Sequence, residues 1–184
     1  MLLVFDLNGV LVHSQFHRLA GNQGVRIGNK QVWLRPGARE LLLAMAGCRL
    51  AIWSSMQLSN VQAIVQHFFA DIPFEFVWGR EHCQPAPNYG SIKDPRQLPG
   101  YPQCVIFDDS PEKIPAELQR QHWWRVPTYR PELSDDQFLL ELINVLAELP
   151  SLRSRAGTPP GQHTPCPGGQ PAPAACTAAS PPQQ

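Results

Sequence analysis

Short runs of mostly apolar residues alternate along this chain with segments of helical periodicity, and this alternation limits the possible folds most strongly. The apolar runs lie at residues 2–5, 50–53, 74–77 and 104–107. Such runs are typical of parallel strands buried on both faces. Apolar residues recur at helical spacing in residues 37–45, 60–69 and 138–149. Strands that alternate with helices predict an α/β fold with a mostly parallel central sheet.

Composition predicts where this domain ends. Residues 150–184 contain no Val, Ile, Phe, Trp or Tyr and are rich in Pro, Gly and Ala. Such a segment buries too little apolar area to offset its ordering entropy, so we expect a folded domain at residues 1–149 and a disordered tail at 150–184. Within the domain, Gly28-Asn29 separates two short apolar segments and predicts a small hairpin inserted after the first strand.

Charge and cysteine content exclude several classes of protein. The chain carries 15 basic and 15 acidic residues, so we expect no direct nucleic-acid partner, which would require a clustered basic excess. No apolar run approaches the ~20 residues of a membrane span, and no basic segment precedes the apolar start. The five cysteines include no CxxC pair. We therefore expect no membrane span and a reducing intracellular compartment, cytoplasmic or nuclear.

Polar residues follow each of the four predicted strands. Asp6 follows the first, Ser54-Ser55 the second and Asp108-Asp109 the fourth, while Lys93 follows the third after a short loop. The carboxyl ends of parallel strands meet at one edge, where open α/β sheets bind ligands. Carboxylates suit Mg²⁺, hydroxyl and ammonium groups suit phosphoryl oxygens, and an Asp can attack phosphorus. The pattern predicts a magnesium-dependent phosphoryl-transfer site.

Six segments carry motif-like patterns in order along the chain: Phe5–Val12, Leu34–Gly37, Ile52–Ser55, Arg80–Cys83, Ile92–Asp94 and Ile106–Pro111. In the same order, they resemble the DLDxTLV, RPG, hydroxyl, RESC, VKDL and DDSP or DNSP motifs of the haloacid-dehalogenase (HAD) superfamily, in its FCP/SCP-type CTD-phosphatase-like branch (the FCP homology or NIF domain). The resemblance covers residues 2 to about 149. It implies a HAD-like Rossmannoid three-layer sandwich.

The resemblance also implies a role for each site residue. It makes Asp6 the nucleophile and a Mg²⁺ ligand, with the Asn8 backbone carbonyl, Asp108 and Asp109 completing the protein ligands. Asp109 takes the direct ligand position of this branch. The implied phosphate-binding residues are Ser54, Ser55 and Lys93, and the residue that orients the substrate is Arg80.

Asn8 departs from the family pattern, in which this position holds the general acid/base Asp. An amide has no titratable proton near neutral pH, and general acid–base catalysis is worth about 10²–10⁴-fold in rate. We therefore expect a weakened phosphoric monoester hydrolase acting on phosphoserine or phosphothreonine in proteins. Residues 55–92 leave no room for a large cap domain, and an open site suits a phosphorylated protein or peptide.

Other interpretations stay open. One is a catalytically inactive scaffold of the same family that binds peptides, like its import-receptor relative, and another is a HAD phosphatase of small metabolites. Asn8-Gly9 is also the pattern of a tight hairpin turn. We expect the chain to be a monomer.

Overall fold

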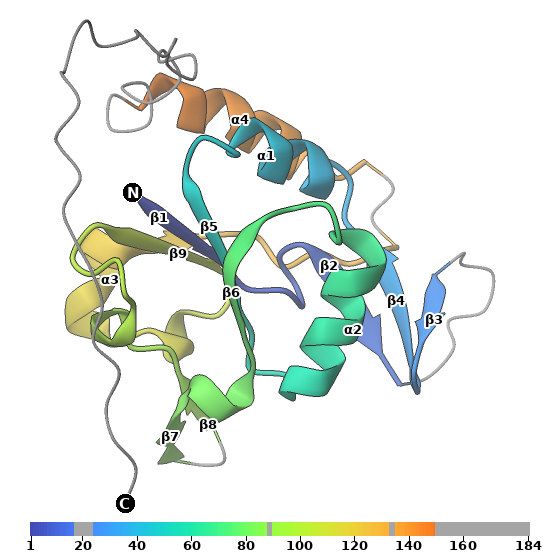
Figure 1. The fold of residues 1–184 in the computed structure, drawn as a ribbon, viewed down its shortest axis with the longest axis horizontal. Helices are drawn as coiled ribbons and strands as arrows, with labels where there is room; N and C mark the ends of the chain where they lie inside the picture. The colour runs from blue at the N-terminus through green and yellow to red at the C-terminus, as the bar shows by residue number, and fades with distance from the viewer. Residues whose placement is uncertain (17–23, 88–89, 133–134, 150–184) are drawn as a thin grey trace, which may run out of the picture.

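A five-stranded parallel sheet forms the centre of the computed structural model, which describes residues 1–16, 24–87, 90–132 and 135–149. The strand order is β10-β9-β1-β5-β6 (Figure 1). The strands are β1 (Leu2–Phe5), β5 (Arg49–Trp53), β6 (Phe74–Trp78), β9 (Cys104–Asp108) and β10 (Trp123–Arg125). The predicted α/β fold and its four strands are confirmed. The edge strand β10 was not predicted, because three residues are too few to show a period.

Helices cover both faces of this sheet. Leu3 and Phe5 of β1 point into a core shared with α1 (Ala38–Ala44), α2 (Leu58–Phe68) and α4 (Phe138–Glu148), and α1 and α4 lie side by side (Figure 1). Leu2 and Val4 point into a second core, on the side of α3 (Ala116–His122) and the 3₁₀ turns η3 (Pro95–Gln97) and η4 (Pro111–Lys113). Among the described residues, no helix is long and apolar enough to span a membrane.

A second, antiparallel sheet contains the predicted hairpin. Its strand order is β2-β4-β3, with β2 (Val12–Gln15), β3 (Val25–Ile27) and β4 (Lys30–Leu34). The β3–β4 hairpin turns at Gly28, whose φ is 58°. The sequence did not predict that β2 would pair with β4, because β2 is mostly polar. The predicted disordered tail at residues 150–184 lies outside the described residues.

The chain reaches Lys93 by a longer route than predicted. Between β6 and Lys93 lie the 3₁₀ turn η1 (Arg80–His82) and a hairpin of β7 (Gln84–Ala86) and β8 (Gly90–Ile92), so the predicted short loop is wrong. These three-residue strands contain Pro85 and Gly90, which conceal a strand pattern. The described parts of residues 55–92 form α2, β6, η1 and this hairpin, which build no separate cap domain.

Arg35 connects three segments that are far from it in the sequence. Its buried guanidinium donates hydrogen bonds to the Val10 carbonyl (3.2 Å) and the Pro127 carbonyl (2.9 Å), and it pairs with Asp136 at 2.9 Å. Removing one partner of a buried ion pair leaves the other charge uncompensated. The sequence identified Arg35 only as part of a family motif, and these contacts give its side chain a structural role.

We expect Arg35→Met to lower the free energy of unfolding by about 3–5 kcal/mol, because it strands Asp136 and two carbonyl groups. Urea denaturation of the full chain measures this change. The exposed Arg26→Met, whose Nε bonds only to the nearby Gly28 carbonyl in the described structure, is the matched control and should change stability by less than about 0.5 kcal/mol. Equal losses in the two variants would contradict this role.

Candidate active site

Three neighbouring strands deliver polar side chains to one edge of the central sheet. Asp6 directly follows β1, Ser54 directly follows β5, and Asp108 is the last residue of β9. Because β1 pairs in parallel with both other strands, with Phe5 opposite Ile52 and opposite Phe107, the three strands end level with one another. All three polar side chains are buried. The adjacency of strands far apart in sequence creates this candidate site.

The loop after β1 is held by hydrogen bonds that fix its side chains. Asp6 Oδ1 accepts a hydrogen bond from the Leu7 backbone N–H at 2.7 Å. Asn8 Oδ1 accepts from both the backbone N–H of Ser14 (2.7 Å) and its hydroxyl (2.9 Å). Asn8-Gly9 forms no β-hairpin of β1 with β2, since β1 pairs with β5 and β9. The alternative interpretation as a plain hairpin is therefore wrong.

Gly9 brings the two acidic loops into contact. Its φ of 88° favours glycine, and a Cβ at this position would lie 2.9 Å from Asp109 Cγ and closer still to Oδ2. Any larger residue would therefore push the Asp109 carboxylate away from the loop after β1. The Asn-Gly pair serves close approach of the two loops here, which explains its presence without a hairpin.

Asp6, Asp108 and Asp109 form a carboxylate cluster. One oxygen from each lies within 4.8 Å of the others, and Asp6 and Asp108 are buried. The structure thus brings together the acidic residues predicted from two distant motifs. Hard oxygen donors at this spacing fit a hard divalent cation such as Mg²⁺ and do not fit a soft metal that prefers sulfur or imidazole.

Two lysines contact the carboxylate cluster. Lys93 is fully buried, with its Nζ 2.5 Å from Asp108 Oδ2 and 3.2 Å from Asp6 Oδ2. Lys113, at the end of η4, places its Nζ 3.0 Å from Asp6 Oδ2, 3.6 Å from Asp108 Oδ1 and 4.0 Å from Asp109 Oδ1. The sequence predicted Lys93 in this place but missed Lys113. Its four-residue spacing from Asp109 was the available signal, although that spacing is common on ordinary surfaces.

Opposing effects separate the pKa values of the two buried carboxyl groups. For Asp6, burial raises the pKa, but the charges of Lys93 and Lys113 and hydrogen bonds from Lys113 and Leu7 outweigh burial and lower the pKa to about 2. For Asp108, burial and the negative charge of Asp6 outweigh the two lysines and raise the pKa to about 6. Asp6 is therefore ionised across the neutral range, the form that a carboxylate nucleophile needs.

Ser54, Ser55 and Arg80 lie beside the carboxylate cluster. The Ser54 hydroxyl accepts a hydrogen bond from the Met56 backbone N–H at 3.4 Å, and Arg80 Nε donates to the Ser55 carbonyl at 2.8 Å. An open pocket of about 480 Å³ adjoins these residues, with Ser55, Arg80, Glu112 and Lys113 in its wall. The structure therefore places an exposed guanidinium and a partly exposed ammonium around one opening at the cluster.

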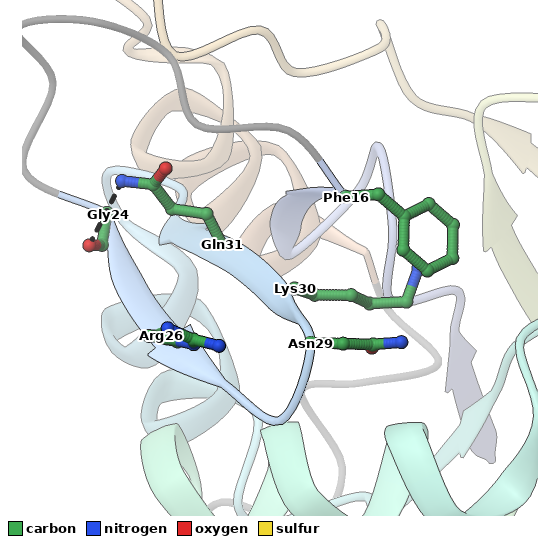
Figure 2. Close-up of a pocket in the computed structure, with 6 residues that line it drawn as sticks. All are labelled: Phe16, Gly24, Arg26, Asn29, Lys30 and Gln31. Atoms are coloured by element: carbon green, nitrogen blue, oxygen red, sulfur yellow. Dashed lines mark hydrogen bonds between the residues drawn. The ribbon is translucent and has the colours of Figure 1, made fainter.

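The small antiparallel sheet carries a second pocket with cationic side chains in its wall. A pocket of about 360 Å³ is lined by Phe16, Gly24, Arg26, Asn29, Lys30 and Gln31 (Figure 2). The Lys30 ammonium lies 3.7 Å from the centroid of the exposed Phe16 ring. Burial, and next the positive charge of Arg80, lower the pKa of Lys30. This pocket shares no lining residue with the pocket beside Arg80 and Lys113.

Comparisons with known proteins agree with this arrangement. A family model described as NLI interacting factor-like phosphatase (NIF) matches residues 1–155. The chain belongs to this family. The NIF domain thus accounts for the whole described structure, and the suspected FCP-type resemblance is confirmed. No curated protein sequence matches the chain.

Solved structures show the same fold. A variant of fission yeast RNA polymerase II CTD phosphatase Fcp1, bound to beryllium fluoride, is 13% identical with a TM-score of 0.55, over 83% of this chain and 50% of that one. A structure of Fcp1 described as an essential RNA polymerase II CTD phosphatase is also 13% identical with a TM-score of 0.55, over 78% and 48%. The NIF domain therefore has the HAD-like fold, and it spans about half the length of these chains.

Proposed function

We propose that this NIF domain is a slow, Mg²⁺-dependent phosphoprotein phosphatase that acts on phosphoserine or phosphothreonine through an aspartyl-phosphate intermediate. The observation that carries the proposal is the buried Asp6 carboxylate, ionised at neutral pH and placed between two lysines and two further carboxylates. A nucleophile, positive charge and hard oxygen ligands in one place are what phosphoryl transfer requires.

The residues divide the reaction as follows. An Asp6 oxygen attacks phosphorus, a new O–P bond forms, and the bond to the serine or threonine oxygen breaks. That oxygen leaves with the electron pair and takes up a proton from solvent water. Water then attacks the aspartyl-phosphate, releasing inorganic phosphate and restoring the Asp6 carboxylate. The phosphoryl oxygens need donors throughout. The Ser54 hydroxyl lies at the end of β5, the strand next to β1, and the Lys93 ammonium lies 3.2 Å from Asp6 Oδ2.

Asp6, Asp108, Asp109 and the Asn8 backbone carbonyl would hold the Mg²⁺. When bound, the ion supplies positive charge that stabilises the phosphoryl oxygens of the transition state. The three carboxylate oxygens within 4.8 Å of one another support this assignment. Lys93 carries positive charge for the same purpose from the protein itself.

Asn8 is the reason to expect slow turnover. The leaving oxygen needs a proton, and the attacking water must lose one, at the position where Asn8 stands. The Asn8 amide is fixed through Oδ1 by Ser14 and has no titratable proton to give. Loss of general acid–base catalysis lowers the rate by about 10²–10⁴-fold and leaves attack by Asp6 intact.

The surroundings of the site favour a protein substrate. No cap domain covers it in the described residues, and Arg80 and Lys113 line the open pocket of about 480 Å³ beside it. An open, cationic surface suits a phosphorylated segment of a protein, which extends past the reacting group, better than a small metabolite that must be enclosed. The Fcp1 structures are those of an RNA polymerase II CTD phosphatase. From them we take for this chain only the class of substrate, a phosphorylated protein.

The second candidate is a catalytically inactive scaffold that binds peptides, and Asn8 is the observation that favours it. Hydrolysis of an aryl phosphate by the full chain, in Mg²⁺ and in EDTA, separates the two. We expect slow hydrolysis that EDTA abolishes, together with thermal stabilisation by Mg²⁺ plus beryllofluoride, a mimic of aspartyl-phosphate. Stabilisation without hydrolysis would support the scaffold. The absence of both stabilisation and hydrolysis would overturn both candidates. Faster turnover of metabolites than of phosphopeptides would overturn the protein substrate.

A further inference from the structure

Lys113 contacts all three carboxylates that the proposed function assigns to the metal. Its Nζ lies 3.0, 3.6 and 4.0 Å from oxygens of Asp6, Asp108 and Asp109. Lys93, by contrast, forms ion pairs with two of these carboxylates, those of Asp6 and Asp108. Within the described residues, the Lys113 ammonium is therefore the cation that lies within 4.0 Å of all three carboxylates.

The backbone around Lys113 is fixed, so its reach into the cluster follows from the fold. Lys113 N–H donates to the Ser110 carbonyl at 3.2 Å, and the Lys113 carbonyl accepts from the Lys93 N–H at 2.7 Å. The Ser110 N–H in turn donates a hydrogen bond to Asp108 Oδ1 at 2.8 Å. These hydrogen bonds join the turn η4 to the residue that follows β8 and to the end of β9.

A divalent cation and an ammonium compete for the same oxygens. Mg²⁺ requires ligand oxygens at about 2.0–2.1 Å, whereas an ammonium donates hydrogen bonds to such oxygens from about 2.7–2.9 Å or more. Three carboxylates and two lysines leave the cluster with one net negative charge, against two if Lys113 were neutral. A less negative cluster attracts a divalent cation less strongly.

The open pocket beside the cluster has room for the Lys113 ammonium. Its side chain is 17% exposed, whereas that of Lys93 is 0% exposed. Lys113 lines the open pocket of about 480 Å³ together with Glu112, which offers a carboxylate outside the cluster. Rotation about the side-chain bonds of Lys113 would move its ammonium into this pocket without a change of the backbone.

We propose that Lys113 is a built-in counter-cation of the metal site, which neutralises the carboxylates in the metal-free protein and lowers their affinity for Mg²⁺ because its ammonium must leave for the ion to bind. This inference rests on the proposed function, since it takes the cluster to be the metal site. It adds that the affinity is set by a residue outside the motifs of that site.

Calorimetric titration of the full chain with Mg²⁺ alone, without phosphate, tests the inference. We expect Lys113→Met to bind Mg²⁺ about tenfold or more tightly than the parent, because one competing positive charge is gone. In EDTA, the same variant should melt at a lower temperature than the parent, because the buried carboxylates lose a partner. Added Mg²⁺ should then raise its melting temperature by more than it raises that of the parent.

Lys30→Met is the matched control, because it removes the same charge from the hairpin, where Lys30 lies over the Phe16 ring. It should leave Mg²⁺ affinity within about threefold of the parent value. If Lys113→Met does not fold in EDTA, Lys113→Gln is titrated instead, since its amide still donates hydrogen bonds, and the same tenfold gain is expected.

Equal or weaker Mg²⁺ binding by a folded Lys113 variant would overturn the inference. Absence of Mg²⁺ binding in both parent and variants would overturn it together with the metal dependence of the proposed function. Tighter binding by the variant, with no hydrolysis of an aryl phosphate by any form, would support the counter-cation and refute only the catalytic proposal.

Discussion

Replacing Asn8 by Asp should raise kcat for aryl-phosphate hydrolysis by about 10²–10⁴-fold, the usual worth of general acid–base catalysis. The geometry is ready for the change. The Ser14 N–H and hydroxyl, which donate to Asn8 Oδ1 at 2.7 and 2.9 Å, donate equally well to a carboxylate oxygen. The second terminal atom, an amide nitrogen in the parent, becomes an oxygen that can give and take a proton.

Steady-state kinetics in saturating Mg²⁺ measure this gain, with Asn8→Ala as the control that changes the side chain without adding a proton donor. Intact mass of the parent preparation checks that Asn8-Gly9 has not deamidated, because a small deamidated fraction would mimic activity of the parent. Equal rates for the parent and Asn8→Asp would contradict the assignment of this position to acid–base catalysis.

Replacing Asp6 by Asn should lower hydrolysis by about 10³-fold or more in the Asn8→Asp background, since the covalent step loses its nucleophile. The background is chosen because its higher rate makes a large loss measurable. Stabilisation by Mg²⁺ plus beryllofluoride should disappear as well. Asn is nearly the same size as Asp, so the fully buried side chain still fills its place.

Asp71→Asn is the matched control, because Asp71 is exposed and pairs with Arg39 on the surface, and it should leave the rate unchanged. Circular dichroism tests whether Asp6→Asn is folded, because the substitution removes a negative charge beside Lys93 and Lys113. Retention of more than a tenth of the rate would show that Asp6 is not the nucleophile.

Much of the sheet was predictable because buried parallel strands have a local signature. Leu2–Phe5 and Cys104–Asp108 are recognisable from runs of consecutive apolar residues, and each run stops where a carboxylate begins. Ligands gather at the carboxyl edge of such sheets, and this rule alone predicts that Asp6 and Asp108 lie at the same edge. The family resemblance added roles, such as that of Asn8, which periodicity does not contain.

The short elements were not predictable in this way. The strands β7, β8 and β10 have three residues each, and the hairpin that carries Lys93 into the core contains a proline and a glycine. Elements of this size form because their neighbours supply hydrogen-bond partners, so their own sequence holds little information. The burial of Arg35 is a similar case, since its partners Pro127 and Asp136 lie far along the chain.

The sequence by itself determined the α/β class, four of the five strands of the central sheet and the acidic and hydroxyl residues that follow them, because apolar periodicity is a local property. Tertiary structure alone decided that Lys113 lies among three carboxylates, that Gly9 presses against Asp109 and that Ser14 holds Asn8. The reason is physical: the charge on a carboxylate, the reach of an ammonium and the room for a Cβ depend on which distant segments the fold brings within a few ångströms.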